Sequence, residues 1–221
     1  MIIAIDGPAG SGKTTTARKV AKSLGFIHIN TGAMYRGITL QFIREKINFS
    51  DVDSMKKILE TTKFDFAETH LGALNMNGEN ISAEISTSFV TEKVSRISSI
   101  SKVRKKMVEY QRNMSKGKNV VLEGRDIGTI VFPNADYKFY LIADIQVRAQ
   151  RRKKEMEAVG EHKSLEEILL FLKNRDQQDS SRKHAPLIKA KDAIELDTTE
   201  LSIDEQVNYI INIVNQNQKG A

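Results

Sequence analysis

The segment from Gly7 to Thr14 reads G-x-x-x-x-G-K-T, and it constrains the fold of this chain more than any other feature. The apolar run just before it, at residues 2–5, predicts a buried strand, and residues 15–21 predict a helix. A glycine-rich loop between a strand and a helix is typical of the phosphate-binding P-loop, in which backbone N–H groups and the positive end of the helix surround an anion. This context favours a P-loop over a glycine-rich turn with a chance lysine, and it predicts binding of a nucleoside triphosphate.

The residues of this loop have distinct expected roles. Its glycines allow backbone torsions that a Cβ would forbid, so several N–H groups can point at one anion. Lys13 can reach the β- and γ-phosphates, and the hydroxyl of either Thr14 or Thr15 can meet Mg²⁺. The sequence leaves the two threonines as alternatives. The expected ATP-binding residues are Gly7, Pro8, Ala9, Gly10, Ser11, Gly12, Lys13, Thr14 and Thr15.

The composition of the 221 residues narrows the class of protein. Hydrophobic residues make up 40% and charged residues 28%, as in a soluble globular protein, and no apolar stretch approaches the ~20 residues of a membrane span. The lack of cysteine, and an N-terminal apolar run without a basic flank, favour a cytoplasmic protein. The net charge of +6 has two interpretations: a basic face that binds nucleic acid, or arginines that converge on a cleft for two nucleotides.

Strand and helix patterns alternate along most of the chain. Further strands are expected at 26–29, 119–123, 137–142 and 193–196, and helices at 33–46, 51–60, 88–100, 102–116 and 144–157, with capping boxes that open two more at 164 and 202. This order predicts a three-layer α/β fold, a parallel sheet with helices on both faces and ligands at the carboxyl ends of the strands. From Lys63 the period changes to two, and Asn77-Gly78 predicts a hairpin, so a small antiparallel insertion is expected at 63–86, with its alternation continuing through Ile81 and Ala83.

Polar clusters follow two of the expected strands. Thr31 to Arg36 follows the second strand, and an arginine there can bind a phosphate with both ends of its guanidinium, although an isolated one would read as an exposed helix residue. Glu123 to Gly128 follows the strand at 119–123, where Glu123 stands in a Walker-B-like position and could hold a water of Mg²⁺. The adjacent Arg125 and Asp126 could instead be a surface turn with a weak ion pair, but their place after a buried strand favours function.

Two further clusters lie on expected helices. Arg175, Asp179 and Arg182 have the spacing of one helical face, which fits either half of an anion and ribose clamp or a solvated salt-bridge stripe. The basic stretch 148–154 fits either a mobile lid over a transferring phosphate or a solvated basic face. The histidines lack ligand spacing and receive no metal or catalytic role; they are His28, His70, His162 and His184.

Together these segments resemble the bacterial cytidylate kinases, the CMP/dCMP kinases of the nucleoside monophosphate kinase superfamily. The resemblance runs from Ile3 to about Val214, and it rests on separated motifs that occur in the same order. They are residues 5–8 with the P-loop, 31–36, 124–133, 175–182, 185–187 and 196–199. It implies a core at 1–35, 117–147 and 183–221, a monophosphate-binding region at 36–116 that includes the insertion, and a lid at 148–182.

The resemblance also implies roles for individual residues. Arg36, Arg125 and Arg182 would bind the CMP phosphate, and Arg175 and Asp179 the ribose. Ser95, Arg104 and Asp126 would read the cytosine edge, with Thr31 also on the CMP side, and the catalytic residues would be Lys13, Arg148, Arg151 and Arg152. Two positions depart from the family pattern. Residues 12–15 read Gly-Lys-Thr-Thr where many members have Gly-Lys-Gly-Thr or Gly-Lys-Ser-Thr, and Glu123 stands where many have Asp, one methylene shorter.

The implied reaction is the Mg²⁺-dependent transfer of the γ-phosphoryl group of ATP to CMP or dCMP, by a monomer that binds neither nucleic acid nor membrane. The acceptor is already an anion, so alignment and charge stabilisation suffice without a general base. Two alternatives stay open at this point. One is another small-molecule P-loop kinase, acting on UMP, dTMP or a metabolite such as shikimate, and the other is an RNA-binding P-loop NTPase. The 6% aromatic content disfavours the second.

Overall fold

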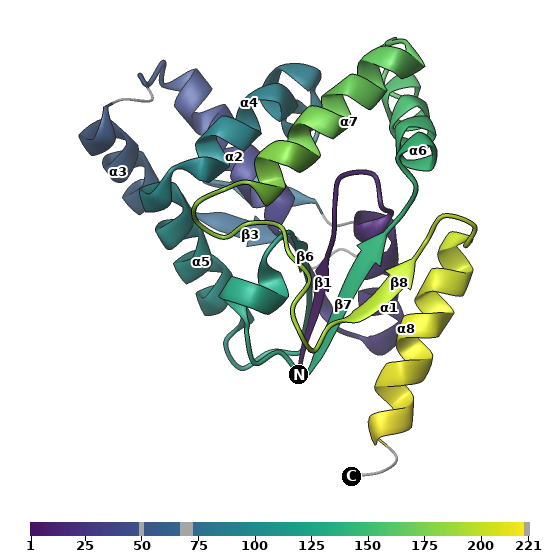
Figure 1. The fold of residues 1–221 in the computed structure, drawn as a ribbon. Coiled ribbons are helices and arrows are strands. Elements are labelled where there is room, and N and C mark those ends of the chain that lie inside the picture. The colour runs from purple at the N-terminus through teal and green to yellow at the C-terminus, as the bar shows by residue number, and fades with distance from the viewer. Residues whose placement is uncertain (49–50, 67–72, 219–221) are drawn as a thin grey trace.

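A computed structural model describes residues 1–48, 51–66 and 73–218, and in this part of the chain a five-stranded sheet forms the centre (Figure 1). Its strand order is β2-β6-β1-β7-β8, and every neighbouring pair is parallel. The strands are β1 (Ile2–Asp6), β2 (Ile27–Asn30), β6 (Val120–Gly124), β7 (Tyr137–Ile142) and β8 (Ile194–Asp197). The expected α/β fold and the expected strands are confirmed, with shifts of one residue at most strand ends.

Helices cover both faces of this sheet. The described helices are α1 (Lys13–Leu24), α2 (Thr31–Arg44), α3 (Val52–Thr61), α4 (Ser88–Ser99), α5 (Ser101–Ser115), α6 (Ile145–Glu157), α7 (Leu165–Ser180) and α8 (Ile203–Gln218). Successive strand residues point to opposite faces. Ile3 and Ile5 therefore pack with α1 and α8, whereas Ala4 packs with α2 to α5. Because both faces are covered, the strands read as continuous apolar runs.

Two helices begin earlier than their apolar pattern indicated. The P-loop helix runs from Lys13 rather than from 15. Helix α2 begins at Thr31 because the side chain of Asn30 caps it, with Asn30 Oδ1 accepting the N–H of Ala33 at 2.8 Å. Both capping boxes are present: Ser164 and Glu167 exchange hydrogen bonds at the start of α7, and Ser202 and Glu205 do so before α8.

The antiparallel insertion is a second, three-stranded sheet, β3 (Phe64–Phe66), β4 (Leu74–Met76) and β5 (Glu79–Asn80). Asn77 and Gly78 both have positive φ, 54° and 85°, as the predicted type I′ turn requires. The expectation that the alternation continues to Ala83 is wrong. Pairing ends near Ile81, whose N–H still bonds the carbonyl of Leu74, and a 3₁₀ turn follows at Glu84–Ser86. Residues 67–72 of the insertion, which include His70, lie outside the described residues.

Helices α6 and α7 lie above the carboxyl ends of the strands, and the turn between them contacts α4 (Figure 1). Glu161 in this turn accepts hydrogen bonds from the backbone N–H and hydroxyl of Ser88, the first residue of α4. Lys163 forms an ion pair with Glu92 at 3.0 Å. Segments more than 70 residues apart in sequence therefore close over the same edge of the sheet.

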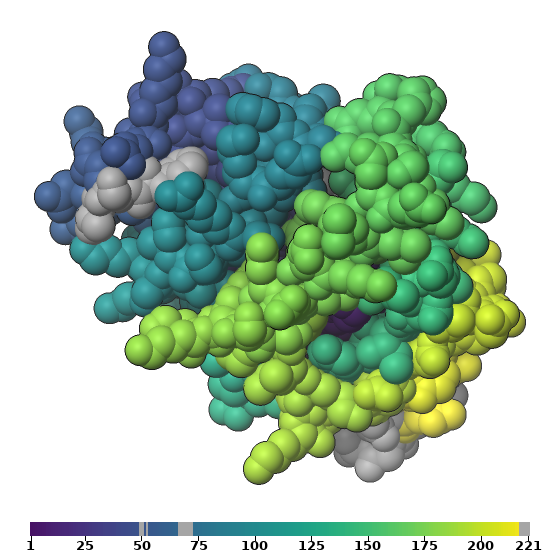
Figure 2. All heavy atoms as spheres, turned by 45° about the horizontal axis from the view of Figure 1, so that its top comes forward, coloured from purple at the N-terminus to yellow at the C-terminus, as the bar shows by residue number. Residues whose placement is uncertain are grey.

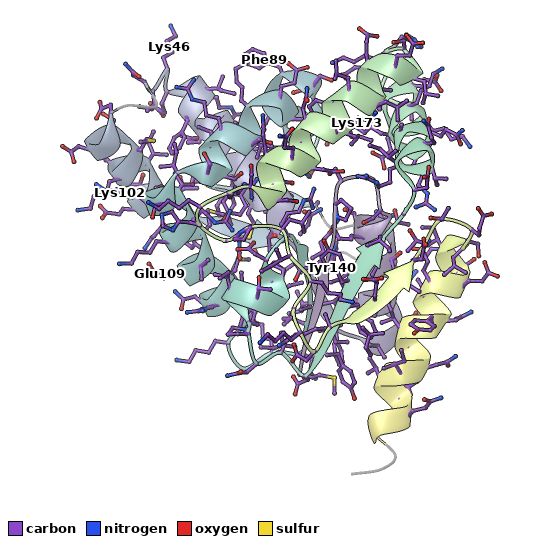
Figure 3. All side chains as sticks on the ribbon, in the orientation of Figure 1. Lys46, Phe89, Lys102, Glu109, Tyr140 and Lys173 are labelled. Atoms are coloured by element: carbon purple, nitrogen blue, oxygen red, sulfur yellow. The ribbon has the colours of Figure 1, made fainter. Side chains whose placement is uncertain are left out.

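Many of the charged side chains lie on outer helix faces. Figure 3 shows Lys102 and Glu109 on the side of α5 that points away from the central sheet, and both are exposed. Charge of this kind adds to the net total without marking a ligand site. Among the described residues, none of the helices combines the length and the apolar character that crossing a bilayer needs.

Candidate active site

A cavity of about 360 Å³ opens at the carboxyl ends of the strands, between the P-loop and the segments above it. Figure 2 shows the molecule from this side, with purple atoms of the N-terminal segment visible at the bottom of a hollow between green segments. Most of the predicted site residues line this cavity. They are Ala9, Gly10, Gly12, Lys13, Thr14, Thr15, Thr31, Arg36, Arg104, Glu123, Arg125, Asp126, Arg152, Arg175, Asp179 and Arg182.

The P-loop has a conformation that depends on its glycines. Gly7 has a φ of 148°, and a Cβ at this position would lie 2.1 Å from the carbonyl oxygen of Leu141. Gly12 has a φ of 86° and precedes the first residue of α1. Lys13 is buried, and its Nζ donates to the carbonyl oxygen of Pro8 at 2.5 Å and to Ser11 Oγ at 3.2 Å. Burial and the nearby Arg125 lower the pKa of Lys13 well below its usual value, so an anion beside it would relieve an unfavourable charge.

Glu123 connects the P-loop to the second strand. Its Oε2 accepts the hydroxyl of Thr14 at 2.8 Å, and its Oε1 lies 3.2 Å from Nε2 of His28. Burial alone would raise the pKa of Glu123, but His28, Lys13 and Thr14 together hold it below the usual value, so the side chain is ionised. A hydroxyl beside a carboxylate provides two oxygen ligands that suit Mg²⁺. This ion keeps several waters and binds phosphate oxygens. The contact with Glu123 favours Thr14 over Thr15 for such a site.

Positive charge is in excess around the cavity. Nε of Arg36 and Nε of Arg175 are buried, and neither has a hydrogen-bond partner among the described residues. Burial lowers the pKa of Arg36 to about 10, and burial with repulsion from Arg125 lowers the pKa of Arg175 to about 9. In the described part of the chain, seven cations (Lys13, Arg36, Arg104, Arg125, Arg152, Arg175, Arg182) line the cavity against four carboxylates (Glu123, Asp126, Glu155, Asp179).

Asp179 joins two of these arginines. Its Oδ2 accepts from Nε of Arg125 at 2.9 Å, and its Oδ1 accepts from Nη2 of Arg182. Although burial alone would raise it, these two arginines hold the pKa of Asp179 below its usual value. The expectation that Arg182 continues the helical face is wrong, because α7 ends at Ser180 and Arg182 lies beyond it. The ion pair with Asp179, rather than helical spacing, places its guanidinium at the cavity.

Arg104 and Asp126 form a buried ion pair that lines the same cavity. Arg104 also donates to the carbonyl of Ser98 at 3.0 Å, and its guanidinium lies 5.5 Å from the centre of the Tyr35 ring. The predicted site residue Ser95 is not among the lining residues, whereas Ser98, one turn further along α4, is. The cavity wall thus presents a guanidinium and a carboxylate side by side.

The arginines of α6 differ from one another. Arg148 is buried and donates to the carbonyl of Ala9 at 3.1 Å and to Asp176 Oδ2 at 2.7 Å, so it holds α6 and α7 against the P-loop. Arg151 donates to the carbonyl of Thr198 at 2.6 Å. Of the three predicted catalytic arginines, only Arg152 lines the cavity among the described residues. The three arginines therefore fit neither alternative as a group: they do not all lie on a solvated face, and they do not all point into the cavity.

Two functional contacts escaped the sequence reasoning. Asp6, which received no role of its own from the sequence, is buried, and its carboxylate accepts the N–H groups of Ile127 at 2.9 Å and Gly128 at 2.7 Å. It therefore holds the loop after Asp126 against the end of β1. His28, set aside for lack of ligand spacing, contacts Glu123 from the neighbouring strand. The signal for both was a polar residue in a strand that is otherwise apolar, a position that requires a partner.

Comparison with known proteins agrees with the motifs. A model of the cytidylate kinase family matches residues 3–216. A cytidylate kinase from Caldanaerobacter subterraneus subsp. tengcongensis is 44% identical over 218 residues, which cover 99% of this chain and 96% of that protein. Another from Fusobacterium nucleatum subsp. nucleatum is 45% identical over 210 residues, 95% of each chain.

Among solved structures, a shikimate kinase from Bacteroides thetaiotaomicron has a TM-score of 0.50 with 12% identity, and the match covers 97% of this chain and 98% of that one. A likeness at this level of identity concerns the fold alone. The family model and the two relatives, by contrast, match nearly the whole length, the relatives at 44% and 45% identity. The chain therefore belongs to the cytidylate kinase family.

Proposed function

We propose that this protein transfers the γ-phosphoryl group of ATP to CMP or dCMP and releases ADP with CDP or dCDP. The observation that carries the proposal is the cavity itself, whose lining combines the P-loop, the Arg104–Asp126 pair and an excess of cations. One anionic ligand would leave part of this charge without a partner. Two nucleotides placed end to end would fill both halves and meet the cations in the middle.

In the proposed reaction, a phosphate oxygen of CMP forms a bond to the γ-phosphorus of ATP as the bond to the β,γ-bridging oxygen breaks. The oxygen nucleophile is already anionic, so no side chain has to remove a proton. Lys13 and the P-loop N–H groups would bind the ATP phosphates, and Arg36, Arg125 and Arg182 the CMP phosphate. Their work is to bring two repelling polyanions into line and to stabilise the charge of the transition state.

Thr14 and Glu123 would hold Mg²⁺, with Glu123 acting through a bound water. When bound, the metal would neutralise charge on the β- and γ-phosphates and stabilise the departing oxygen. The hydrogen bond between the two side chains, 2.8 Å long, supports their assignment to one site.

The Arg104–Asp126 pair would select cytosine. The cytosine edge carries an amino donor at N4 and acceptors at N3 and O2, so a carboxylate and a guanidinium side by side complement it. Uracil has an acceptor at position 4, which the carboxylate of Asp126 would repel. Arg175 and Asp179 would face the ribose. Each Asp179 oxygen has a second lone pair, so its pairing with the arginines leaves room for a hydroxyl.

We further propose that residues 148–182 act as the lid and residues 36–116 as the monophosphate-binding region around a core of 1–35, 117–147 and 183–221. The contacts of Glu161 with Ser88 and of Lys163 with Glu92 support this division, because they join the outer ends of the two moving parts over the cavity. Closure of this kind would exclude water and suppress hydrolysis of ATP.

A coupled assay of ADP release tests the proposal across a panel of acceptors: CMP, dCMP, UMP, dTMP, AMP and shikimate, each with ATP and Mg²⁺. We expect CMP and dCMP to give the highest kcat/KM. A clear preference for another acceptor would overturn the assignment of the substrate. ATP hydrolysis that RNA stimulates, with no CDP formed, would favour an RNA-binding NTPase in place of a kinase.

A further inference from the structure

His28 lies in strand β2, next to the strand that carries Glu123. Strand β2 pairs with β6 in a register that sets His28 beside Val121 and Asn30 beside Glu123. Because residues two apart in a strand share a face, His28 and Glu123 point to the same side of the sheet, where α1 begins. Both side chains are buried, with exposed fractions of 9% and 5%.

The contacts of His28 show which of its ring nitrogens donates a hydrogen bond to Glu123. Glu123 is an ionised acceptor whose other oxygen already accepts from Thr14, so Nε2 of His28 must carry the proton at the 3.2 Å contact. Nδ1 is buried, and it has no hydrogen-bond partner among the described residues. His28 therefore donates to Glu123 from Nε2.

We propose that His28 is a positioning residue that holds the Glu123 carboxylate against Thr14. The side chain of Glu123 is one methylene longer than Asp, so it has an additional torsion to restrain. Without the donor from β2, this carboxylate could turn away from Thr14, and the two side chains would no longer present their oxygens to one Mg²⁺. The inference rests on the proposed function of Glu123 and Thr14 as the Mg²⁺ pair.

Two substitutions distinguish the effect of the hydrogen-bond donor of His28 from the effect of the volume of its side chain. In His28→Gln the amide nitrogen can occupy the place of Nε2, whereas in His28→Asn it reaches only the place of Nδ1. We measure binding of ATP by titration calorimetry, once with Mg²⁺ and once with EDTA, and binding of CMP alongside. With Mg²⁺ present, we expect His28→Asn to weaken ATP binding about 10-fold, because one hydrogen bond to a charged group is lost. In EDTA the same variant should weaken ATP binding less than about twofold. His28→Gln should stay within about threefold of the unaltered protein in all three titrations.

The shortened carboxylate supplies a second measurement. In Glu123→Asp the side chain no longer reaches Nε2, so adding His28→Asn to it should change ATP binding with Mg²⁺ less than about twofold. If His28→Asn does not fold, His28→Leu, which fills the ring's space without a donor, replaces it in the same comparisons.

Equal losses with Mg²⁺ and with EDTA, equal losses in the Gln and Asn variants, or unchanged binding in both would overturn the inference. An assay of CMP phosphorylation by the unaltered protein distinguishes a wrong role for His28 from a wrong proposed function. If it does not phosphorylate CMP, the function is wrong; if it does and His28→Asn binds ATP and Mg²⁺ normally, only the role of His28 is wrong.

Discussion

Asp6 makes a contribution to stability whose dependence on pH follows from its surroundings. Burial, together with repulsion from Asp126, raises the pKa of Asp6 from 3.8 to about 6, although the N–H groups of Gly128 and Ile127 and the charge of Lys13 act in the opposite direction. The raised pKa means that the folded protein binds this proton more tightly than the unfolded chain. The contribution of Asp6 to the free energy of unfolding is therefore fully present below pH 4 and is lost as the pH rises through about 6.

The magnitude follows from the size of the shift. A rise from 3.8 to about 6 at ~1.36 kcal/mol per pH unit corresponds to about 3 kcal/mol. Asp6→Asn removes the titration. The free energy of unfolding of the unaltered protein, minus that of the variant, should therefore fall by about 2 kcal/mol between pH 4 and pH 7, where most of this contribution is lost. Other carboxylates titrate in both proteins and cancel in the difference, as does the constant cost of placing an amide at this position.

Urea denaturation followed by circular dichroism at steps of half a pH unit measures this difference. Asp51→Asn is a control of opposite sign, because hydrogen bonds from Ser54 lower the pKa of Asp51, so its difference should rise with pH. A difference for Asp6→Asn that stays flat or rises from pH 4 to pH 7 would refute the reasoning. It would mean that solvent reaches the carboxylate, or that the hydrogen bonds from Ile127 and Gly128 and the charge of Lys13 outweigh the effect of burial.

Three further predictions concern the P-loop and the two ends of the cavity. Gly7→Ala should destabilise the fold by at least about 3 kcal/mol and abolish ATP binding, because its Cβ would lie 2.1 Å from the Leu141 carbonyl oxygen; a normal melting temperature would contradict this. Arg182→Ala should lower kcat/KM for CMP about 100-fold through loss of a charged phosphate contact, while the Kd for ATP stays within about twofold; parallel losses in both would show that the division of the cavity is wrong. Asp126→Asn should reduce the preference for CMP over UMP at least about 10-fold, since an amide can donate to uracil; competition between the two acceptors measures it, and an unchanged ratio would remove Asp126 from base selection.

Much of the fold was predictable because it depends on short stretches of sequence. The first strand, the P-loop, the helix after it and the Asn77–Gly78 turn each follow from the torsions and apolar spacing of a few consecutive residues. The boxes at Ser164 and Ser202 close within one helical turn. The alternation of strands and helices then restricts the topology to a parallel sheet with its ligand site at the carboxyl edge.

The pairing of side chains within the site could not be predicted in the same way. Helical spacing predicted that Arg182 belongs with Arg175 and Asp179, but α7 ends before Arg182, and the ion pair with Asp179 is what places it at the cavity. The resemblance pointed to Ser95, whereas the rotation of α4 presents Ser98. These outcomes depend on where a helix stops and how it turns about its axis, which packing against other elements decides.

From the sequence alone, the P-loop, the α/β architecture and the presence of several arginines beyond the loop were determined, because local torsions and hydrophobic period specify them. Only the tertiary structure decided which groups meet. Strand register brings His28 to Glu123 across 95 positions, helix placement brings Thr14 to the same carboxylate across 109, and Asp6 reaches Gly128 across 122. Such contacts depend on the alignment of elements distant in sequence, to within about one residue, because a slip of one residue in a strand turns each side chain to the opposite face.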